Sequence, residues 1–231
     1  MATLLIDTLD GTGRFSAYRA DPAGTPRAAV IVIQEIFGVN PGIRAKCDRL
    51  AEQGYLAIAP DLFWRIAPGI NLNPDVPEEM ARALELMGQF DQATAIADIE
   101  ATIRTARALV SGGKVGAIGF CLGGRLAYMT AARTDIDASV GYYAVGIDGL
   151  LDEKHAIAHP LMLHIAGADH FVSAEVQAAM HAGLDDHPRV TLHDYPGEDH
   201  GFATELGERR SEAAARLADE RTAAFLAEAL G

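Results

Sequence analysis

Short apolar runs alternate along this chain with longer segments in which apolar residues recur every three or four positions. Apolar runs of about five residues are typical of buried strands, and the longer spacing is typical of amphipathic helices. The alternation therefore indicates β-α units around a parallel sheet. The run AVIVI at 29–33 is apolar throughout, as expected for a strand covered on both faces. The expected strands span residues 4–8, 14–20, 28–34, 55–59, 114–119, 138–144, 161–166 and 190–195.

The expected helices lie between these strands and at the end of the chain. One apolar stripe, on a helix that begins near residue 92, consists of Ile96, Ile99, Ile103, Ala106 and Val110. A second stripe consists of Ala214, Leu217, Ala218, Phe225 and Ala229. Further helices are expected over residues 41–53, 77–87, 122–132 and 173–184.

Two parts of the pattern depart from a regular alternation. The short turn GTG at 11–13 predicts a hairpin between the first two strands, and hence an antiparallel N-terminal edge of the sheet. Residues 61–91 are rich in proline and too long for a plain connection, so we expect this excursion to cover a site. Without a repeat or linker, residues 1–231 are expected to form a single α/β domain, whose mostly parallel central sheet of about eight strands is flanked by helices.

Composition narrows the possible partners and location. The 231 residues are 49% hydrophobic, which is enough for a large core. A formal net charge of -13 argues against nucleic acid and anionic membranes, because both would repel the average surface. Two cysteines, no signal-peptide pattern and no apolar run of about 18 residues lead us to expect a cytoplasmic protein. We expect a small-molecule substrate, no cofactor, and a monomer or weak oligomer.

Gly119, Cys121 and Gly123 form the pattern G-x-C-x-G at an expected strand-to-helix junction. This is the form of a nucleophile elbow with sulfur in place of oxygen. The glycines leave room for the strained turn, and a helix N-terminus favours a thiolate. The alternative is a packed thiol before a glycine-rich turn. Cys47 lies on the apolar face of an expected helix with no elbow around it, and we interpret it as a core residue.

A cysteine nucleophile needs a base and a group that orients the base. In the elbow architecture, the acid follows the nucleophile along the chain and the histidine comes last. Asp169 and His200 fit this order, each just after one of the last two expected strands. Asp199 is the alternative acid. Because it is next to His200 in sequence, however, its carboxylate would approach the imidazole from the wrong direction. His170 is a candidate for shaping the pocket, and no H-x-x-x-H or C-x-x-C spacing supports a metal site.

Glu35 follows directly after the apolar run of a central strand. A carboxylate at that place is costly to desolvate unless it has a partner, and the alternative is a solvated loop residue. In the elbow architecture the oxyanion hole uses the backbone N–H after the nucleophile and one from the loop after this strand. Leu122 and Ile36 occupy those two places.

These residues lie in segments that resemble the dienelactone hydrolase family, a branch of the α/β-hydrolases with a Cys-His-Asp triad. The matching segments are QEIFGVN at 34–40, QGYLAIAPDLF at 53–63, GKVGAIGFCLGG at 113–124, VGYYAVG at 140–146, GADHFV at 167–172 and DHGFA at 199–203. The resemblance implies an α/β-hydrolase fold, Cys121 as nucleophile, His200 as general base and acid, and Asp169 as its orienting partner. It also implies that Glu35 contacts the resting thiol and helps to form the thiolate when substrate arrives.

The sequence departs from the family where the substrate carboxylate is held. In members that hydrolyse dienelactone, arginines from the excursion and from shortly after the catalytic histidine hold this carboxylate. Here Thr204 follows the histidine by four residues, and Met80 stands at the corresponding excursion position. Arg82, two residues on, and Arg125, one turn beyond the nucleophile, are not direct matches. The missing arginines predict a preference for uncharged substrates.

Sulfur at the nucleophile restricts the substrate further. A thiolate, with a usual pKa of about 8.5, leaves more easily than an alkoxide, so attack on a simple alkyl ester tends to reverse. We therefore expect a hydrolase that cleaves an enol lactone or activated ester through a cysteine acyl-enzyme. The alternatives are a thioesterase or aryl carboxylesterase with an uncharged substrate and, in another class, a non-catalytic binding or redox-sensing protein. The expected substrate-contacting residues are Phe37, Trp64, Met80, Arg82, Tyr143 and Phe202, with Met87 added in an apolar acyl pocket.

Overall fold

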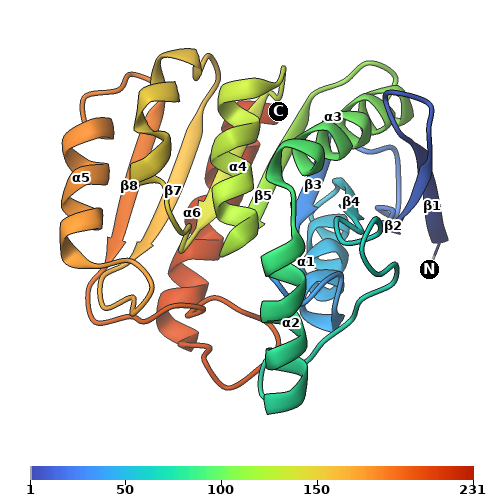
Figure 1. Ribbon diagram of the computed structural model, residues 1–231. Coiled ribbons are helices and arrows are strands. Elements are labelled where there is room, and N and C mark those ends of the chain that lie inside the picture. The colour runs from blue at the N-terminus through green and yellow to red at the C-terminus, as the bar shows by residue number, and fades with distance from the viewer. Residues whose placement is uncertain (1) are drawn as a thin grey trace. The chain divides into compact units, whose positions relative to one another are not determined.

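The computed structural model describes residues 2–231, and Figure 1 shows their helices and strands. These residues gather into two compact units. The first unit comprises the chain up to residue 116 together with residues 205–208. The second comprises residues 117–204 together with 209–231. The single domain expected over residues 1–231 stays a prediction.

The first unit contains the predicted hairpin and the first parallel strands. Its elements are β1 (Ala2–Asp7), β2 (Arg14–Ala20), β3 (Ala29–Ile33), β4 (Leu56–Pro60), α1 (Pro41–Glu52), α2 (Pro77–Gln89) and α3 (Gln92–Leu109). The spatial order is β1-β2-β4-β3, in which β2 is antiparallel to both neighbours and β3 is parallel to β4. The N–H of Thr8 donates to the carbonyl of Gly13 at 3.0 Å and closes the hairpin. The antiparallel N-terminal edge is therefore confirmed.

The local sequence explains the core of this unit. Both α1 and α3 pack against β3 and β4, and every residue of these two strands is buried. α1 begins after Asn40, whose Oδ1 accepts a hydrogen bond from the N–H of Ile43 at 3.1 Å, with Pro41 in the first turn. A capping side chain and an early proline are both N-terminal helix signals, which is why the start of α1 was predictable.

The second unit contains the remaining strands, in the order β5-β6-β7-β8. Its elements are β5 (Val115–Phe120), which begins at the end of the first unit, β6 (Ala138–Tyr142), β7 (Leu161–Ala166), β8 (Val190–Tyr195), α4 (Leu122–Arg133), the 3-10 helix η1 (Asp148–Ala156), α5 (Ala174–Leu184) and α6 (Glu212–Leu230). β6, β7 and β8 are parallel.

Helices cover both faces of β6. A Cβ on Gly124 of α4 would lie 2.7 Å from the carbonyl oxygen of Tyr142, and a Cβ on Gly141 would lie 3.0 Å from the carbonyl oxygen of Gly124. Only glycine permits so close an approach of a helix to a strand. The Tyr142 side chain, next along the strand, turns to the other face, where its hydroxyl lies 3.2 Å from the carbonyl oxygen of Ala218 in α6. α4 and α6 therefore lie on opposite faces of the strand.

The predicted strand and helix bounds agree with the observed ones to within two residues. β6 ends before the predicted residue 144 because Tyr143 has a φ of 37°, which a strand cannot accommodate. η1 was not predicted, because its residues show no clear period. Among the helices that the structure describes, none is long and apolar enough to span a membrane.

Candidate active site

Cys121 occupies a sharp turn between β5 and α4. Its φ of 56° and ψ of -115° are strained for a residue with a side chain. A Cβ on Gly119 would lie 1.9 Å from the carbonyl oxygen of Gly123, so the turn leaves no room for a larger residue there. The strand-turn-helix context of a nucleophile elbow is therefore present, and the cysteine is partly exposed.

Backbone hydrogen bonds hold this turn in place. The N–H of Cys121 donates to the carbonyl of Tyr142 at 3.0 Å, and the N–H of Arg125 donates to the carbonyl of Cys121 at 3.1 Å. Leu122 is the first residue of α4, so its N–H is one of the donors that a helix leaves unpaired. The sulfur lies at a helix N-terminus, where the partial positive charge favours an anion.

His200 and Asp169 form a buried pair in the same unit. His200 Nδ1 lies 2.8 Å from Asp169 Oδ2, and each side chain is only 1% exposed. The other carboxylate oxygen, Oδ1, accepts a hydrogen bond from the N–H of Phe171 at 2.8 Å. A carboxylate on Nδ1 keeps the proton on that nitrogen and leaves Nε2 available to accept one. This arrangement suits a general base.

Aromatic rings surround the imidazole of His200. The ring of Tyr143 lies 5.0 Å from it and the ring of Phe171 4.8 Å from it, both edge to face. Phe202 packs against Tyr143 at 5.7 Å. Phe171 was not singled out from the sequence, although it follows Asp169 by two residues. Phe171 is 62% exposed, so its ring offers an apolar surface beside His200.

Asp199, the alternative acid, faces a different partner. Its Oδ1 lies 2.8 Å from His170 Nδ1 and accepts the backbone N–H of His200 at 2.6 Å. Burial raises the pKa of Asp199, but hydrogen bonds from the ring of His170 and from two backbone N–H groups outweigh it and lower the pKa to about 2. The ring of His200 pairs with Asp169, the acid predicted from chain order, and the role of Asp169 in the reaction stays a prediction.

The same neighbourhood contains donors that could meet at one metal ion. Ligand atoms of Asp169, His170 and Asp199 lie within 4.8 Å of one another. Oxygens of both carboxylates already accept N–H groups, and an ion bound there would compete with the contact between Asp169 and His200. We therefore treat these residues as a hydrogen-bonded cluster.

Glu35 lies just beyond β3 in the first unit and is 5% exposed, which excludes the solvated alternative. The side chain of Gln34 connects Glu35 to the start of the excursion. Its Nε2 donates to the carbonyl of Glu35 at 3.3 Å, and its Oε1 accepts the N–H of Leu62 at 3.0 Å. The N–H of Leu72 donates to the carbonyl of Phe37 at 2.9 Å. The excursion is thus hydrogen-bonded to the loop that carries Glu35 and Ile36.

Comparison with known proteins identifies the family. The family model described as "Dienelactone hydrolase family" matches residues 15–230. This chain belongs to the dienelactone hydrolase family. A carboxymethylenebutenolidase of Pseudomonas putida is 40% identical over 96% of this chain and 94% of its own. A provisionally named carboxymethylenebutenolidase of Azospirillum brasilense is 47% identical over 95% of both chains.

Solved structures agree with this assignment. The crystal structure of a provisionally named dienelactone hydrolase from Klebsiella pneumoniae has a TM-score of 0.82, with 28% identity over 98% of this chain and 99% of that chain. The α/β-hydrolase fold predicted from the sequence is therefore confirmed, and the protein is an ester-hydrolysing enzyme, a lactone or ester hydrolase.

In this member of the dienelactone hydrolase family, Trp64 and Arg82 were expected to contact the substrate. Both side chains have partners within the first unit. The indole N–H of Trp64 donates to Asp98 at 2.8 Å, and its ring stacks on Phe15 at 5.8 Å. Arg82 pairs with Glu85 one turn along α2 at 2.5 Å. Phe37 is buried and Met80 is half-buried. Contact of these four side chains with the substrate stays a prediction.

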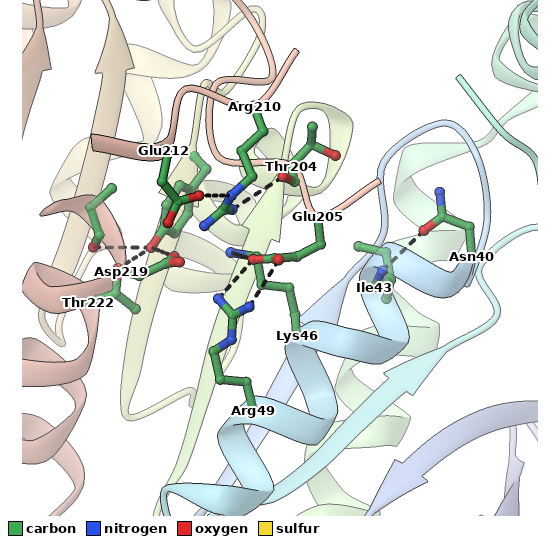
Figure 2. Close-up of polar contacts among 12 residues, drawn as sticks. Asn40, Ile43, Lys46, Arg49, Thr204, Glu205, Arg210, Glu212, Asp219 and Thr222 are labelled. Atoms are coloured by element: carbon green, nitrogen blue, oxygen red, sulfur yellow. Dashed lines mark hydrogen bonds and ion pairs between the residues drawn. The ribbon is translucent and has the colours of Figure 1, made fainter. Parts of the chain in front are cut away.

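The arginines of the second unit also differ from the family pattern. Arg125 donates through Nη1 to the carbonyl of Gly146, and burial lowers its pKa. Thr204 is buried, and its carbonyl accepts from Arg210 at 3.3 Å (Figure 2). The guanidinium of Arg209, which the sequence did not single out, lies against Gly201, where a Cβ would be 3.2 Å from its Cζ. Arg209 thus brings a positive charge near the loop of the histidine.

Proposed function

We propose that this protein hydrolyses an enol lactone or another activated ester through an acyl-enzyme on Cys121. One observation supports this most strongly: the strained elbow at Cys121 and the buried pair of His200 and Asp169 occur in one compact unit. A sulfur that only packed in the core would need neither the strained turn nor a histidine oriented by a carboxylate.

In the first step the thiolate of Cys121 attacks the carbonyl carbon and forms a carbon–sulfur bond. The N–H groups of Leu122 and Ile36 donate to the oxygen that becomes negative. The carbon–oxygen bond to the leaving group then breaks, and the leaving group departs as an enolate or phenolate, which is stable enough to leave without a proton. In a lactone this step opens the ring and leaves a thioester on the enzyme.

The second step releases the acid. His200 takes a proton from water, and the hydroxide attacks the thioester carbonyl. Asp169 accepts a hydrogen bond from the other ring nitrogen and stabilises the imidazolium that forms. The carbon–sulfur bond breaks and returns the thiolate, and the imidazolium of His200 gives its proton to the enolate or phenolate.

Glu35 is proposed to prepare the nucleophile. Its burial makes an ionised carboxylate costly, so sharing a proton with a neighbouring group would lower the free energy of the resting state. The family resemblance suggests that this partner is the thiol of Cys121, with the proton moving to Glu35 when substrate arrives. Phe37, Tyr143 and Phe202 are proposed to contact the substrate.

The substrate is proposed to be small and uncharged near the reacting carbonyl. Arg82 and Arg125, which could have held a carboxylate, have other partners in the structure. An aryl ester or a thioester is therefore the second candidate, and an uncharged lactone the first. The charge of -13 and the two cysteines further suggest a cytoplasmic enzyme without a nucleic-acid partner.

The test uses phenyl acetate and an uncharged enol lactone with wild type, Cys121→Ala and Cys47→Ala. The thiol of Cys47 is fully buried and burial raises its pKa, so that variant is the matched control. We expect loss of at least about 10³-fold in kcat/KM for Cys121→Ala and less than about threefold for Cys47→Ala. Mass spectrometry of the quenched reaction should show an acyl adduct only where Cys121 is present. Equal rates for Cys121→Ala and wild type would sink the proposal.

A substrate panel separates the candidates. Uncharged lactones, a carboxylated lactone, aryl esters and acyl thioesters are compared by kcat/KM. A preference for the carboxylated lactone would contradict the uncharged substrate and would point to an arginine such as Arg209. Absence of turnover and of any acyl adduct would favour the binding or redox-sensing protein.

A further inference from the structure

A chain of buried polar side chains lies on the α6 side of β6, β7 and β8. His164, in the middle of β7, stands at its centre and is 1% exposed. Its Nδ1 lies 2.8 Å from the hydroxyl of Tyr195, and its Nε2 lies 2.9 Å from the hydroxyl of Thr222 in α6. Both ring nitrogens therefore have hydroxyl partners, one from a strand and one from a helix.

The chain continues from Thr222 to a carboxylate. The hydroxyl of Thr222 lies 2.6 Å from that of Tyr142, which in turn lies 3.2 Å from Asp219 Oδ1. Figure 2 shows Thr222 and Asp219 one turn apart on α6 with these contacts drawn. Thr222 of α6 thus joins His164 of β7 to Tyr142 of β6, and Asp219 ends the chain.

One direction of donation satisfies every member of the chain. The Tyr195 hydroxyl donates to His164, His164 to Thr222, Thr222 to Tyr142, and Tyr142 to the carboxylate of Asp219. The reverse direction would leave no proton between Tyr142 and Asp219. Burial raises the pKa of Tyr142 well above its usual value, which keeps this phenol a donor.

The backbone of the same residues holds the segments of the proposed active site. The carbonyl of Tyr142 accepts the N–H of Cys121 at 3.0 Å, directly at the elbow. The carbonyl of His164 accepts the N–H of Tyr143 at 2.8 Å, and the ring of Tyr143 packs on the catalytic imidazole. Side chains on one face are therefore coupled to catalytic segments at the strand ends.

Tyr195 plays the same part at the end of β8. Its carbonyl accepts the N–H groups of Gly167 at 3.0 Å and of Glu198 at 3.1 Å. Gly167 begins the segment that leads to Asp169, and Glu198 begins the one that leads to His200. Tyr142 and Tyr195 of the polar chain thus each offer a backbone carbonyl that supports a segment of the proposed triad.

We propose that His164 and Thr222 are positioning residues for the cysteine hydrolase reaction, because the polar chain centred on them holds the ends of β6 and β8 in one fixed arrangement. This inference rests on the proposed function of Cys121, His200 and Asp169. Hydrogen bonds between hydroxyl and imidazole groups are directional, so they fix the rotation and register of side chains that apolar packing alone would leave adjustable. Loss of one hydrogen bond of the polar chain should therefore misplace the triad, although none of the chain's side chains is proposed to contact the substrate.

The principal test is Thr222→Val, which removes the hydroxyl and keeps the shape. We expect kcat for phenyl acetate to fall about tenfold while KM stays within about twofold, because misalignment affects the reacting geometry more than binding. Thr222→Ser keeps the hydroxyl and should restore kcat to within about threefold of wild type. A merely structural residue would lower the folded fraction and leave kcat per folded molecule unchanged.

A second variant tests the other end of the chain. Tyr195→Phe removes the donor to His164 and should also lower kcat several-fold. The matched control is Tyr128→Phe, which removes a buried hydroxyl bonded to the carbonyl of Leu150 at 3.3 Å, outside the polar chain. The control should keep kcat within about twofold. Folded fractions are measured by urea unfolding, and kcat is expressed per folded molecule.

Wild-type kcat in folded Thr222→Val and Tyr195→Phe would overturn the inference, as would an effect confined to KM. Failure of both variants to fold would also overturn it, since the chain would then be structural only. Full activity of Cys121→Ala would instead refute the proposed function. Inactive Cys121→Ala together with fully active Thr222→Val would refute the positioning role alone.

Discussion

At the scale of single residues, the candidate active site contains a buried contact between His200 and Asp169. Both side chains are 1% exposed and lie 2.8 Å apart, so water does not compete for the hydrogen bond. Asp199 is next to His200 in sequence, but its carboxylate accepts only the backbone N–H of His200 and does not pair with that ring. It pairs with the ring of His170. The two carboxylates can therefore be separated by mutation.

We predict that Asp169→Asn lowers kcat by about 10²- to 10⁴-fold, because an amide can donate to Nδ1 and stabilise the wrong tautomer of His200. Asp199→Asn is the matched control, since its Oδ1 can still accept the N–H of His200, and it should stay within about fivefold of wild type. Steady-state kinetics on phenyl acetate measure both. Equal losses in the two variants would contradict the assignment of the acid.

At the scale of elements, the elbow connects β5 to α4 through a turn that leaves no space for a side chain. The carbonyl oxygen of Gly123 would lie 1.9 Å from a Cβ on Gly119, and backbone atoms cannot move aside cheaply. The strain at Cys121 is held by this close packing of glycines.

Gly119→Ala is therefore predicted to lower the free energy of unfolding by about 3 kcal/mol or more and to abolish esterase activity. Gly149→Ala is the matched control, because a Cβ at Gly149 meets nothing within 4 Å, and its unfolding free energy should change by less than about 1 kcal/mol. Urea unfolding and the phenyl acetate assay measure the two effects. A fully active Gly119→Ala would show that the elbow geometry is wrong.

His181 joins two other elements, α5 and β8. Its Nδ1 lies 2.9 Å from Asp185 and its Nε2 3.1 Å from Asp194. The hydrogen bond with Asp185 raises the pKa of His181 above its usual 6.5, against partial burial, and Asp194 adds to the increase. Because the folded state binds the proton more tightly, this stabilisation is complete below about pH 6.5 and is lost as the pH rises through the folded pKa.

We predict that His181→Gln lowers the free energy of unfolding by up to about 1 kcal/mol near pH 5.5, and by less near pH 8.5. The limit is low because both carboxylates are half exposed. Urea unfolding at the two pH values is the measurement, and a larger effect at the higher pH would contradict the sign.

At the scale of the whole molecule, the chain returns to the first unit for only four residues, 205–208, between β8 and α6. Glu205 forms ion pairs that hold this segment to α1: its Oε1 lies 2.8 Å from Lys46 Nζ and 2.9 Å from Arg49 Nη1 (Figure 2). The side chains of Glu205 and Lys46 are only about a tenth exposed. Removing one charge would leave the other buried in a poorly hydrated place.

Glu205→Gln is predicted to lower the free energy of unfolding by about 2–3 kcal/mol, because Lys46 keeps its buried charge without the carboxylate. Glu208→Gln, in the same segment, is the control and should change it by less than about 0.5 kcal/mol. Urea unfolding measures both variants. Similar stability of the two would show that the ion pairs with Glu205 contribute little.

The order of elements and their bounds followed from the sequence, because apolar period, caps and glycine turns are local properties of the chain. AVIVI at 29–33 and the GTG turn at 11–13 each predicted their own structure. η1 was missed because it has no period, and the strand end at Tyr143 was missed because a positive φ at a tyrosine has no sequence signal.

The sequence by itself determined the elbow at Cys121 and the chain order of Asp169 and His200, since each is a short pattern beside a strand end. Only the tertiary structure decided which carboxylate meets the imidazole, that Glu35 is buried, and that Arg125 is engaged with a carbonyl. His164 shows the reason most clearly. The sequence indicated only that it lies in a strand, whereas its two partners come from β8 and α6, 31 and 58 residues away, and meet it because of how the side chains are directed in three dimensions.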